Sequence, residues 1–128
     1  VPTDALNISV VADGSVANDN LVFNPYPAAI QLSTSALATV VAVSTDPFNP
    51  VDQVIVYGTP TGLNPAPALN YAYHDGSSGF VAAGWYDVNN AFGGSQDTVT
   101  IPAGGAFLIR KGAGSADGNW VAAIPYSL

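Results

Sequence analysis

A turn at residues 102–105, Pro-Ala-Gly-Gly, constrains this chain more than any other short stretch of it. Proline fixes the backbone angle that an early turn position requires, and a glycine supplies the left-handed residue that closes a short loop. Because this turn separates residues 97–101 from residues 106–110, the pattern predicts a β-hairpin with a bulge. The second strand, Ala-Phe-Leu-Ile-Arg, is apolar on both faces. Such a strand lies in the centre of a sandwich, or one of its faces meets a partner.

The rest of the chain also joins short apolar runs by turn residues. Residues 5–12 alternate apolar and polar side chains and residues 37–44 are almost wholly apolar, so we predict a strand in each, with further strands at 52–57 and 119–124. Residues 69–74 and 80–86 flank a Gly- and Ser-rich turn and are predicted to form a hairpin. The stretches 46–50 and 58–68 are rich in turn residues and Pro and are predicted to be connections. The chain contains 13 Gly and 10 Pro but no Met and only 2 Lys or Arg residues, so helices lack their usual material. We predict an all-β fold, a single-domain β-sandwich resembling a jelly roll over residues 1–128, with about nine short strands and no significant helix.

The composition limits the classes of partner. Charged residues make up 9% of the chain and hydrophobic residues 48%, whereas an average soluble domain is about 25% charged. A subunit interface, glycans or uncharged polar side chains would explain such a surface. The net charge of −7 repels phosphate and anionic lipid, which argues against nucleic-acid and membrane-surface binding. The apolar runs are too short for an integral membrane segment, and the absence of Met indicates a processed product, so we expect a secreted, extracellular or cell-surface protein.

Several short motifs from residue 51 onward occur in a recognisable order. They are Val-Asp-Gln-Val-Ile-Val at 51–56, Gly-Leu-Asn at 62–64, Tyr-Ala-Tyr at 71–73, Gly-Trp at 84–85, and the Ile-Pro-Ala-Gly-Gly-Ala-Phe-Leu-Ile-Arg-Lys hairpin at 101–111. This order resembles the C-terminal part of an uncharacterised family of exported bacterial all-β proteins and covers somewhat over half of the chain. The resemblance implies export and a β-fold, and it carries no catalytic residue across.

Catalytic chemistry is poorly represented, and we expect that the protein is not an enzyme. The chain has no Cys, and its only histidine, His74, stands beside Asp75 in a turn with Ser77 and Ser78. A Ser–His–Asp site needs three side chains that converge beside an oxyanion hole, and neighbours in one short turn rarely do so. We therefore interpret His74 as a solvent-exposed turn residue. The scattered Asp residues also give no sign of the paired carboxylates of a glycosidase.

Three kinds of ligand or modification site are alternatives. We expect no cofactor, but two loops rich in Asp and Asn offer oxygen ligands for Ca²⁺ without the EF-hand spacing, and their acids are Asp13, Asp19 and Asp87. Aromatic side chains that stack on sugar rings are a second alternative to core packing; the candidates are Tyr71, Tyr73 and Trp85. Asn7 begins an Asn-Ile-Ser triplet and is a glycosylation candidate.

These patterns favour a self-assembling structural subunit, a homopolymer of an extracellular bacterial filament, pilus-like appendage or surface layer. Residues 1–12 form a possible exchangeable N-terminal strand, whose apolar face would fill a groove in a neighbouring copy. Arg110 and Lys111, the two cations, would meet an acidic patch of the next subunit. The expected subunit-interface residues are Leu6, Ile8, Val10, Phe107, Ile109, Arg110 and Lys111. The alternatives are a secreted carbohydrate-binding or adhesin-type module, with glycans as partners, and a viral capsid or decoration protein.

Overall fold

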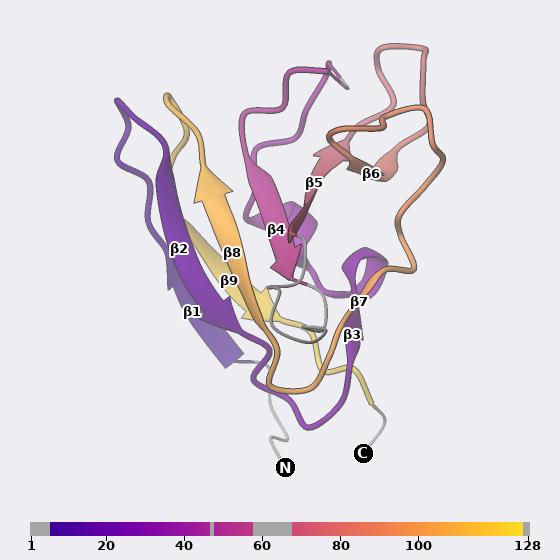
Figure 1. The fold of residues 1–128 in the computed structure, drawn as a ribbon. Helices are drawn as coiled ribbons and strands as arrows, with labels where there is room; N and C mark the ends of the chain where they lie inside the picture. Colours follow the sequence, from indigo (N-terminus) through magenta and orange to yellow (C-terminus); the bar gives the residue numbers. More distant parts are fainter. Residues whose placement is uncertain (1–5, 47, 58–67, 127–128) are drawn as a thin grey trace, which may run out of the picture.

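A computed structural model describes residues 6–46, 48–57 and 68–126 (Figure 1). These residues form nine strands and two short 3-10 turns. The strands are β1 (Leu6–Val10), β2 (Asn18–Phe23), β3 (Ile30–Gln31), β4 (Gln53–Tyr57), β5 (Ala68–His74), β6 (Gly84–Asp87), β7 (Thr100–Ile101), β8 (Ala106–Lys111) and β9 (Gly118–Ala122), and the 3-10 turns are η1 (Leu32–Thr34) and η2 (Leu37–Thr39). The predicted all-β class is confirmed, and the structure fits a single-domain β-sandwich.

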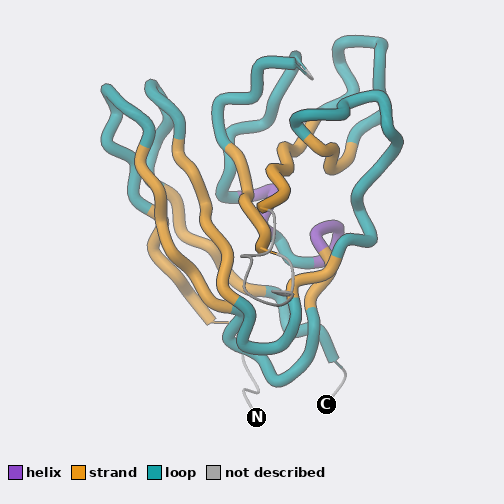
Figure 2. Tube along the Cα trace, viewed as in Figure 1, coloured by secondary structure: helices purple, strands orange, loops and turns teal. Residues whose placement is uncertain are grey.

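Antiparallel pairing joins all of the strands. One sheet has five strands in the order β2-β8-β4-β5-β6, and two smaller sheets consist of the pairs β1-β9 and β3-β7. The long strands stand side by side in Figure 2, and the loops that lead into β4, join β5 to β6 and join β6 to β7 extend beyond them. Phe107 of β8 contacts Trp120 of β9 edge to face, with 5.6 Å between the ring centroids. The β1-β9 pair therefore packs on the inner face of the five-stranded sheet.

The core lies between these layers. Alternation along β8 determines which of its faces lies against the core. Phe107 and Ile109 are fully buried on that face, while Ala106, Leu108 and Arg110 on the other face are half-buried. Trp120 is also fully buried, and its Nε1 donates a hydrogen bond to the carbonyl oxygen of Ser35 at 2.8 Å. Strand β8 is an inner strand of the large sheet, so one of its faces lies in the core, while the side chains of its other face stay half-buried on the outside of the sheet.

The predicted hairpin of residues 97–110 does not form. The turn is present, since Gly105 N donates to Pro102 O at 2.8 Å and Gly104 has a φ of 66°. However, β7 pairs with β3, whereas β8 pairs with β2 and β4, so the turn carries the chain from one sheet to another. The side chain of Asn24 donates to the carbonyl oxygens of Ile101 and Pro102 at 3.2 and 3.1 Å, which fixes the end of β7 beside the segment that leads to β3.

The predicted strand at residues 37–44 is also wrong. These residues form η2 and an irregular segment. The Ser35 hydroxyl donates to Leu32 O at 2.8 Å and accepts from Leu37 N at 3.1 Å, and Ala36 takes a left-handed φ of 64°. Since Leu37 and Val40 are buried, the apolar run indicates burial and not strand structure.

The predicted hairpin of residues 69–74 and 80–86 is confirmed in part by the pairing of β5 with β6, in which Tyr73 lies opposite Trp85. Strand β6 begins only at Gly84, and residues 80–83 are irregular. Three other predicted features fall wholly or partly outside the described residues: residues 1–5 of the exchangeable segment, Pro47 in the turn-rich stretch 46–50, and the connection at residues 58–67. In the part of the chain that the structure describes, no helix has the length and hydropathy needed to cross a membrane.

Candidate functional site

His74 is buried, so its predicted exposure in a turn is wrong. Ser44 covers the end of β5, because Ser44 N donates to Tyr73 O at 2.9 Å and Asp75 N donates to Ser44 O at 3.2 Å. The Nδ1 atom of His74 accepts a hydrogen bond from Gly76 N at 2.8 Å, and Nε2 has no hydrogen-bond partner among the described residues. A Ser–His–Asp site requires hydrogen bonds from the imidazole to a serine hydroxyl and to a carboxylate. Neither imidazole nitrogen of His74 makes such a hydrogen bond in the described structure.

Each of the three candidate calcium ligands forms a hydrogen bond or an ion pair within the chain. Asp13 accepts from the Ser15 hydroxyl at 2.7 Å, Asp19 binds Arg110, and Asp87 accepts from Asn89 N at 2.9 Å. The hydrogen bond from Ser15 lowers the pKa of Asp13. Among residues 6–46, 48–57 and 68–126, no three His, Cys, Asp or Glu side chains are grouped in a way that would hold a metal ion.

The predicted sugar-stacking face belongs to the core. Tyr71 and Trp85 are buried, and Tyr73 is half-buried with its ring against that of Trp85 at a centroid distance of 5.6 Å. Burial and the nearby charge of Asp87 raise the pKa of the Tyr71 phenol. Two of the three rings are therefore core residues, and the third packs against one of them.

Most of the predicted interface residues are also internal. Val10, Phe107 and Ile109 are fully buried within their own chain, and Lys111 is buried with Asp52. Phe107, Ile109 and Lys111 therefore expose almost no surface to a partner, whereas a subunit contact through β1 and Val10 stays a prediction. Burial reverses the expectation for the first three because β8 is an inner strand of the large sheet, while β1 pairs with β9 of the same chain.

The remaining predicted residues reach the surface. Leu6 is exposed, Ile8 is half-buried, and Arg110 lies on the outer face of β8. Asn7 is exposed, and its side-chain oxygen accepts from Asn119 Nδ2 at 2.9 Å, so glycosylation at Asn7 stays a prediction.

A buried ion pair ties several segments together. Lys111 Nζ donates to Asp52 Oδ2 and to the Val40 carbonyl oxygen, both at 2.6 Å, and the Lys111 and Asp52 side chains are only 3% and 0% exposed. The Asp52 carboxylate also accepts from Ala42 N, Gly112 N and the Ser115 hydroxyl at 2.7, 2.8 and 2.9 Å. Burial alone would raise the pKa of Asp52, but these hydrogen bonds outweigh it and hold the pKa below its usual value. The carboxylate is thus fully occupied by structural partners.

An apolar patch lies on the outer face of the five-stranded sheet, and we call it the sheet patch. Alternate residues of β2 face the core, so Leu21 and Phe23 face outward, where they are 61% and 56% exposed. They lie opposite the half-buried Leu108 and Ala106 of β8, and Tyr57 at the end of β4 is also exposed. These five side chains define the sheet patch.

One ion pair lies beside the sheet patch on the same face. Asp19 and Arg110 are cross-strand neighbours, and the guanidinium donates to both carboxylate oxygens at 2.7 and 2.9 Å. This hydrogen bonding lowers the pKa of Asp19 and raises the pKa of Arg110. The charges of the two groups cancel, so this part of the outer face is close to neutral.

A second apolar patch is formed by three phenylalanines in three different loops, and we call it the aromatic patch. Phe48, Phe80 and Phe92 are 56%, 68% and 63% exposed. The ring of Phe92 contacts both others edge to face, at centroid distances of 5.4 Å to Phe48 and 6.4 Å to Phe80. These loops rise at the top of Figure 1, whereas β3 and β7 lie in its lower half.

Sequence reasoning missed the aromatic patch because its members are far apart along the chain. The signal was nevertheless present, since each of the three phenylalanines stands among Gly, Asn, Ser or Pro residues. An aromatic residue in a turn-forming stretch has no strand face on which to be buried.

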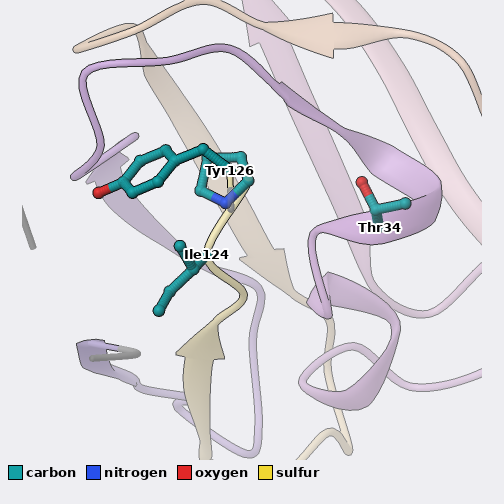
Figure 3. A pocket seen from close by; sticks show the side chains of 4 residues that line it. Thr34, Ile124 and Tyr126 are labelled. Carbon is teal, nitrogen blue, oxygen red and sulfur yellow. The ribbon is translucent and has the colours of Figure 1, made fainter. Parts of the chain in front are cut away.

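Two hollows of the described structure are candidate sites. One, of about 450 Å³, is lined by Thr34, Ile124, Pro125 and Tyr126 (Figure 3). Another, of about 340 Å³, lies between the ends of β4 and β5 and residues 99–102. The described residues that line the two hollows include no carboxylate, imidazole or amine, and their ionisable groups are the phenols of Tyr57, Tyr71 and Tyr126.

Comparison of the chain with protein-family models, with curated proteins and with solved structures finds no match.

Proposed function

We propose that the protein is a self-assembling structural subunit, which polymerises outside a bacterial cell as a filament, appendage or surface layer. The observation that supports this function is the grouping of exposed apolar side chains into two separate patches on a surface with few ions. The largest apolar patch of a typical monomer covers about 300–600 Å² and is often an interaction site.

Burial of the sheet patch would drive association. Fully burying a leucine or phenylalanine side chain contributes about 1.5–3 kcal/mol. Leu21 and Phe23 are adjacent members of the same strand face, so one contact would cover both of them. Part of this gain is offset by the lost freedom of the two subunits, so several such side chains are needed for a stable contact.

The charge distribution favours the same surface. Two copies that each carry a net charge of −7 repel one another over most of their surface. The repulsion is weakest where Arg110 neutralises Asp19, because Lys111, the other cation of the chain, is buried. A contact on the outer face of the sheet therefore brings few unbalanced charges together.

Two patches on one subunit permit a chain of subunits. A single two-fold contact closes after two copies, whereas a second contact elsewhere lets each subunit touch two neighbours and leaves the assembly open. The sheet patch and the aromatic patch come from different elements and would serve as these two contacts. This assembly needs no exchange of β1, which keeps its pairing with β9.

Negative-stain microscopy of patch variants tests the proposed function. We expect extended assemblies from the unaltered chain, and only small oligomers from the double variants Leu21→Ser/Phe23→Ser and Phe80→Ser/Phe92→Ser. The control is Val16→Ser, which changes a similarly exposed apolar residue outside both patches and should assemble normally. Identical behaviour of all four proteins would rule the proposal out.

The aromatic patch supports a second candidate function, a secreted module that binds carbohydrate. Exposed rings stack on the apolar faces of sugars, and Asp46 and Asn49 beside Phe48 offer oxygen and nitrogen atoms for hydrogen bonds. Co-sedimentation with insoluble polysaccharides tests this function. A binding module would lose retention in Phe80→Ser/Phe92→Ser and keep it in Leu21→Ser/Phe23→Ser.

A further inference from the structure

The two edges of the five-stranded sheet differ in how they are covered. At the β6 edge, Trp85 N donates to the Asp97 carboxylate and Trp85 O accepts from Gln96 N, both at 2.8 Å. At the β2 edge, no described strand pairs with the side of β2 that faces away from β8. The unpaired N–H and C=O groups of an edge strand are a template for another strand.

Strand β2 also lacks the features that usually protect an edge. Its sequence, Asn-Asp-Asn-Leu-Val-Phe, contains no Lys and no Pro, and all six residues pair with β8 in continuous register without a bulge. Its single charge, on Asp19, is neutralised by Arg110. The outward side chains beside the open edge are Leu21 and Phe23 of the sheet patch. Among the described residues this edge is therefore unpaired, its outward side chains are apolar at Leu21 and Phe23, and the charge at its Asp19 end is neutralised by Arg110.

The partner that fits this edge is a second copy of the chain. Both copies are acidic, yet the edge itself brings no unpaired charge to the contact. Two identical strands related by a two-fold axis pair antiparallel and bury the same surface on each side. Side chains that face each other across an antiparallel pair must lie on the same face of the sheet. The outward residues of one β2 therefore oppose the outward residues of the other.

This condition leaves few registers. With Leu21 on the two-fold axis, it opposes Leu21 of the partner subunit, and Asp19 opposes Phe23 of the partner subunit. Five residues of each strand then pair, and the two Asp19 carboxylates lie about 13 Å apart along the strands at about 3.3 Å per residue. We infer that two copies join β2 to β2 antiparallel in this register, so that their two sheets become one continuous sheet. The inference rests on the proposed self-assembly, and it places Leu21 and Phe23 of the two copies side by side on one face of the joined sheet.

Single-cysteine crosslinking tests this register, because the chain contains no Cys. Opposed residues of an antiparallel pair have Cα atoms about 4.5–5.5 Å apart, within the range that a disulfide spans. We expect oxidised Leu21→Cys to run mainly as a covalent dimer on a non-reducing denaturing gel and to return to the monomer on reduction.

Phe23→Cys is the matched control, on the same strand, the same face and with similar exposure. Its equivalent in the partner subunit would lie about 13 Å away, so we expect little dimer from Phe23→Cys alone. An equimolar mixture of Phe23→Cys with Asp19→Cys should instead form the mixed dimer, because these two positions oppose each other. Circular dichroism of each variant verifies that it is folded.

The outcomes separate this inference from the function on which it rests. Self-association of the unaltered chain without a Leu21→Cys dimer would overturn the pairing of β2 with β2 and leave the proposed self-assembly in place. Equal crosslinking of Leu21→Cys and Phe23→Cys would overturn the register. A monomer at all concentrations, with no crosslink, would overturn both.

Discussion

Lys111 and Arg110 are neighbours in the sequence but have opposite environments. Lys111 is buried against Asp52, whereas Arg110 is partly exposed beside Asp19. Sequence reasoning placed both cations at a subunit interface, although alternation puts Lys111 on the same, buried face of β8 as Phe107 and Ile109 and leaves Arg110 on the other face. Lys111 is covered because the Val40 carbonyl oxygen accepts from its Nζ, while Ala42 N and Gly112 N donate to the Asp52 carboxylate with which it pairs.

The two cations therefore predict different losses of stability. Lys111→Met leaves the Asp52 carboxylate buried without its cation, and we expect the free energy of unfolding to fall by about 3–5 kcal/mol. Arg110→Met removes a partly exposed pair, which is worth about 0–1 kcal/mol. Urea unfolding at neutral pH measures both changes. Equal losses in the two variants would contradict the structural role of the buried pair.

The lowered pKa of Asp52 predicts a dependence of stability on pH. A carboxyl group whose pKa is lower in the folded state stabilises the protein above its unfolded pKa of about 3.9. This contribution is lost as the pH falls from about 4 through the folded pKa. Other acids with lowered pKa values, such as Asp13 and Asp19, add to the same trend.

Comparison with Asp52→Asn isolates the share that belongs to Asp52. The variant lacks the Asp52 carboxylate and keeps every other acid, so we expect its free energy of unfolding to fall less steeply below pH 4 than that of the unaltered chain. Urea unfolding between pH 7 and pH 2.5 measures the two slopes. Parallel slopes would show that Asp52 does not titrate as inferred.

At the scale of elements, the sequence predicted strands better than it predicted their partners. Strands β4, β5, β6, β8 and β9 lie close to their expected positions, because their apolar runs are bounded by turn residues. The partner of β7 was wrong, since Asn24, which is distant in the sequence, holds the end of that strand. Turn chemistry fixes the local bend, whereas contacts between distant segments decide which strands pair.

Strand β1 offers a direct test of the two routes to assembly. Asn7 of β1 and Val121 of β9 are exposed cross-strand neighbours, so Asn7→Cys/Val121→Cys places two thiols within disulfide range. We expect oxidation of the assembled protein to give a band at the monomer mass on a denaturing gel, because β1 stays on its own chain. Donation of β1 to a neighbour would instead produce a covalent ladder. Single-cysteine versions of the same variant are the controls.

At the scale of the whole molecule, composition indicated that some apolar surface is hidden, but it did not say where. Phe107 and Ile109 were assigned to an interface and lie in the core, while Leu21 and Phe23 belong to a strand whose outward face stays exposed. The difference depends on the order of strands in the sheet, which places β8 inside and β2 at an edge. The location of the exposed apolar surface could therefore be identified only from the structure.

The charge of the whole molecule predicts that salt strengthens assembly. Each copy carries a net charge of −7, so copies repel one another, while the proposed contacts are apolar. The screening length falls from about 30 Å at 0.01 M salt to about 8 Å at 0.15 M. We expect the fraction of assembled protein, measured by sedimentation velocity, to rise over this range. A decrease with salt would indicate contacts held by opposite charges.

Self-assembly through exposed apolar patches is the central claim, and light scattering coupled to size-exclusion chromatography tests it most directly. The unaltered chain should show a molar mass that rises with concentration in multiples of its 13.0 kDa mass. Leu21→Ser/Phe23→Ser should give smaller species at every concentration, because the sheet patch would be lost. A constant mass of one subunit for the unaltered chain, up to the highest soluble concentration, would contradict the claim.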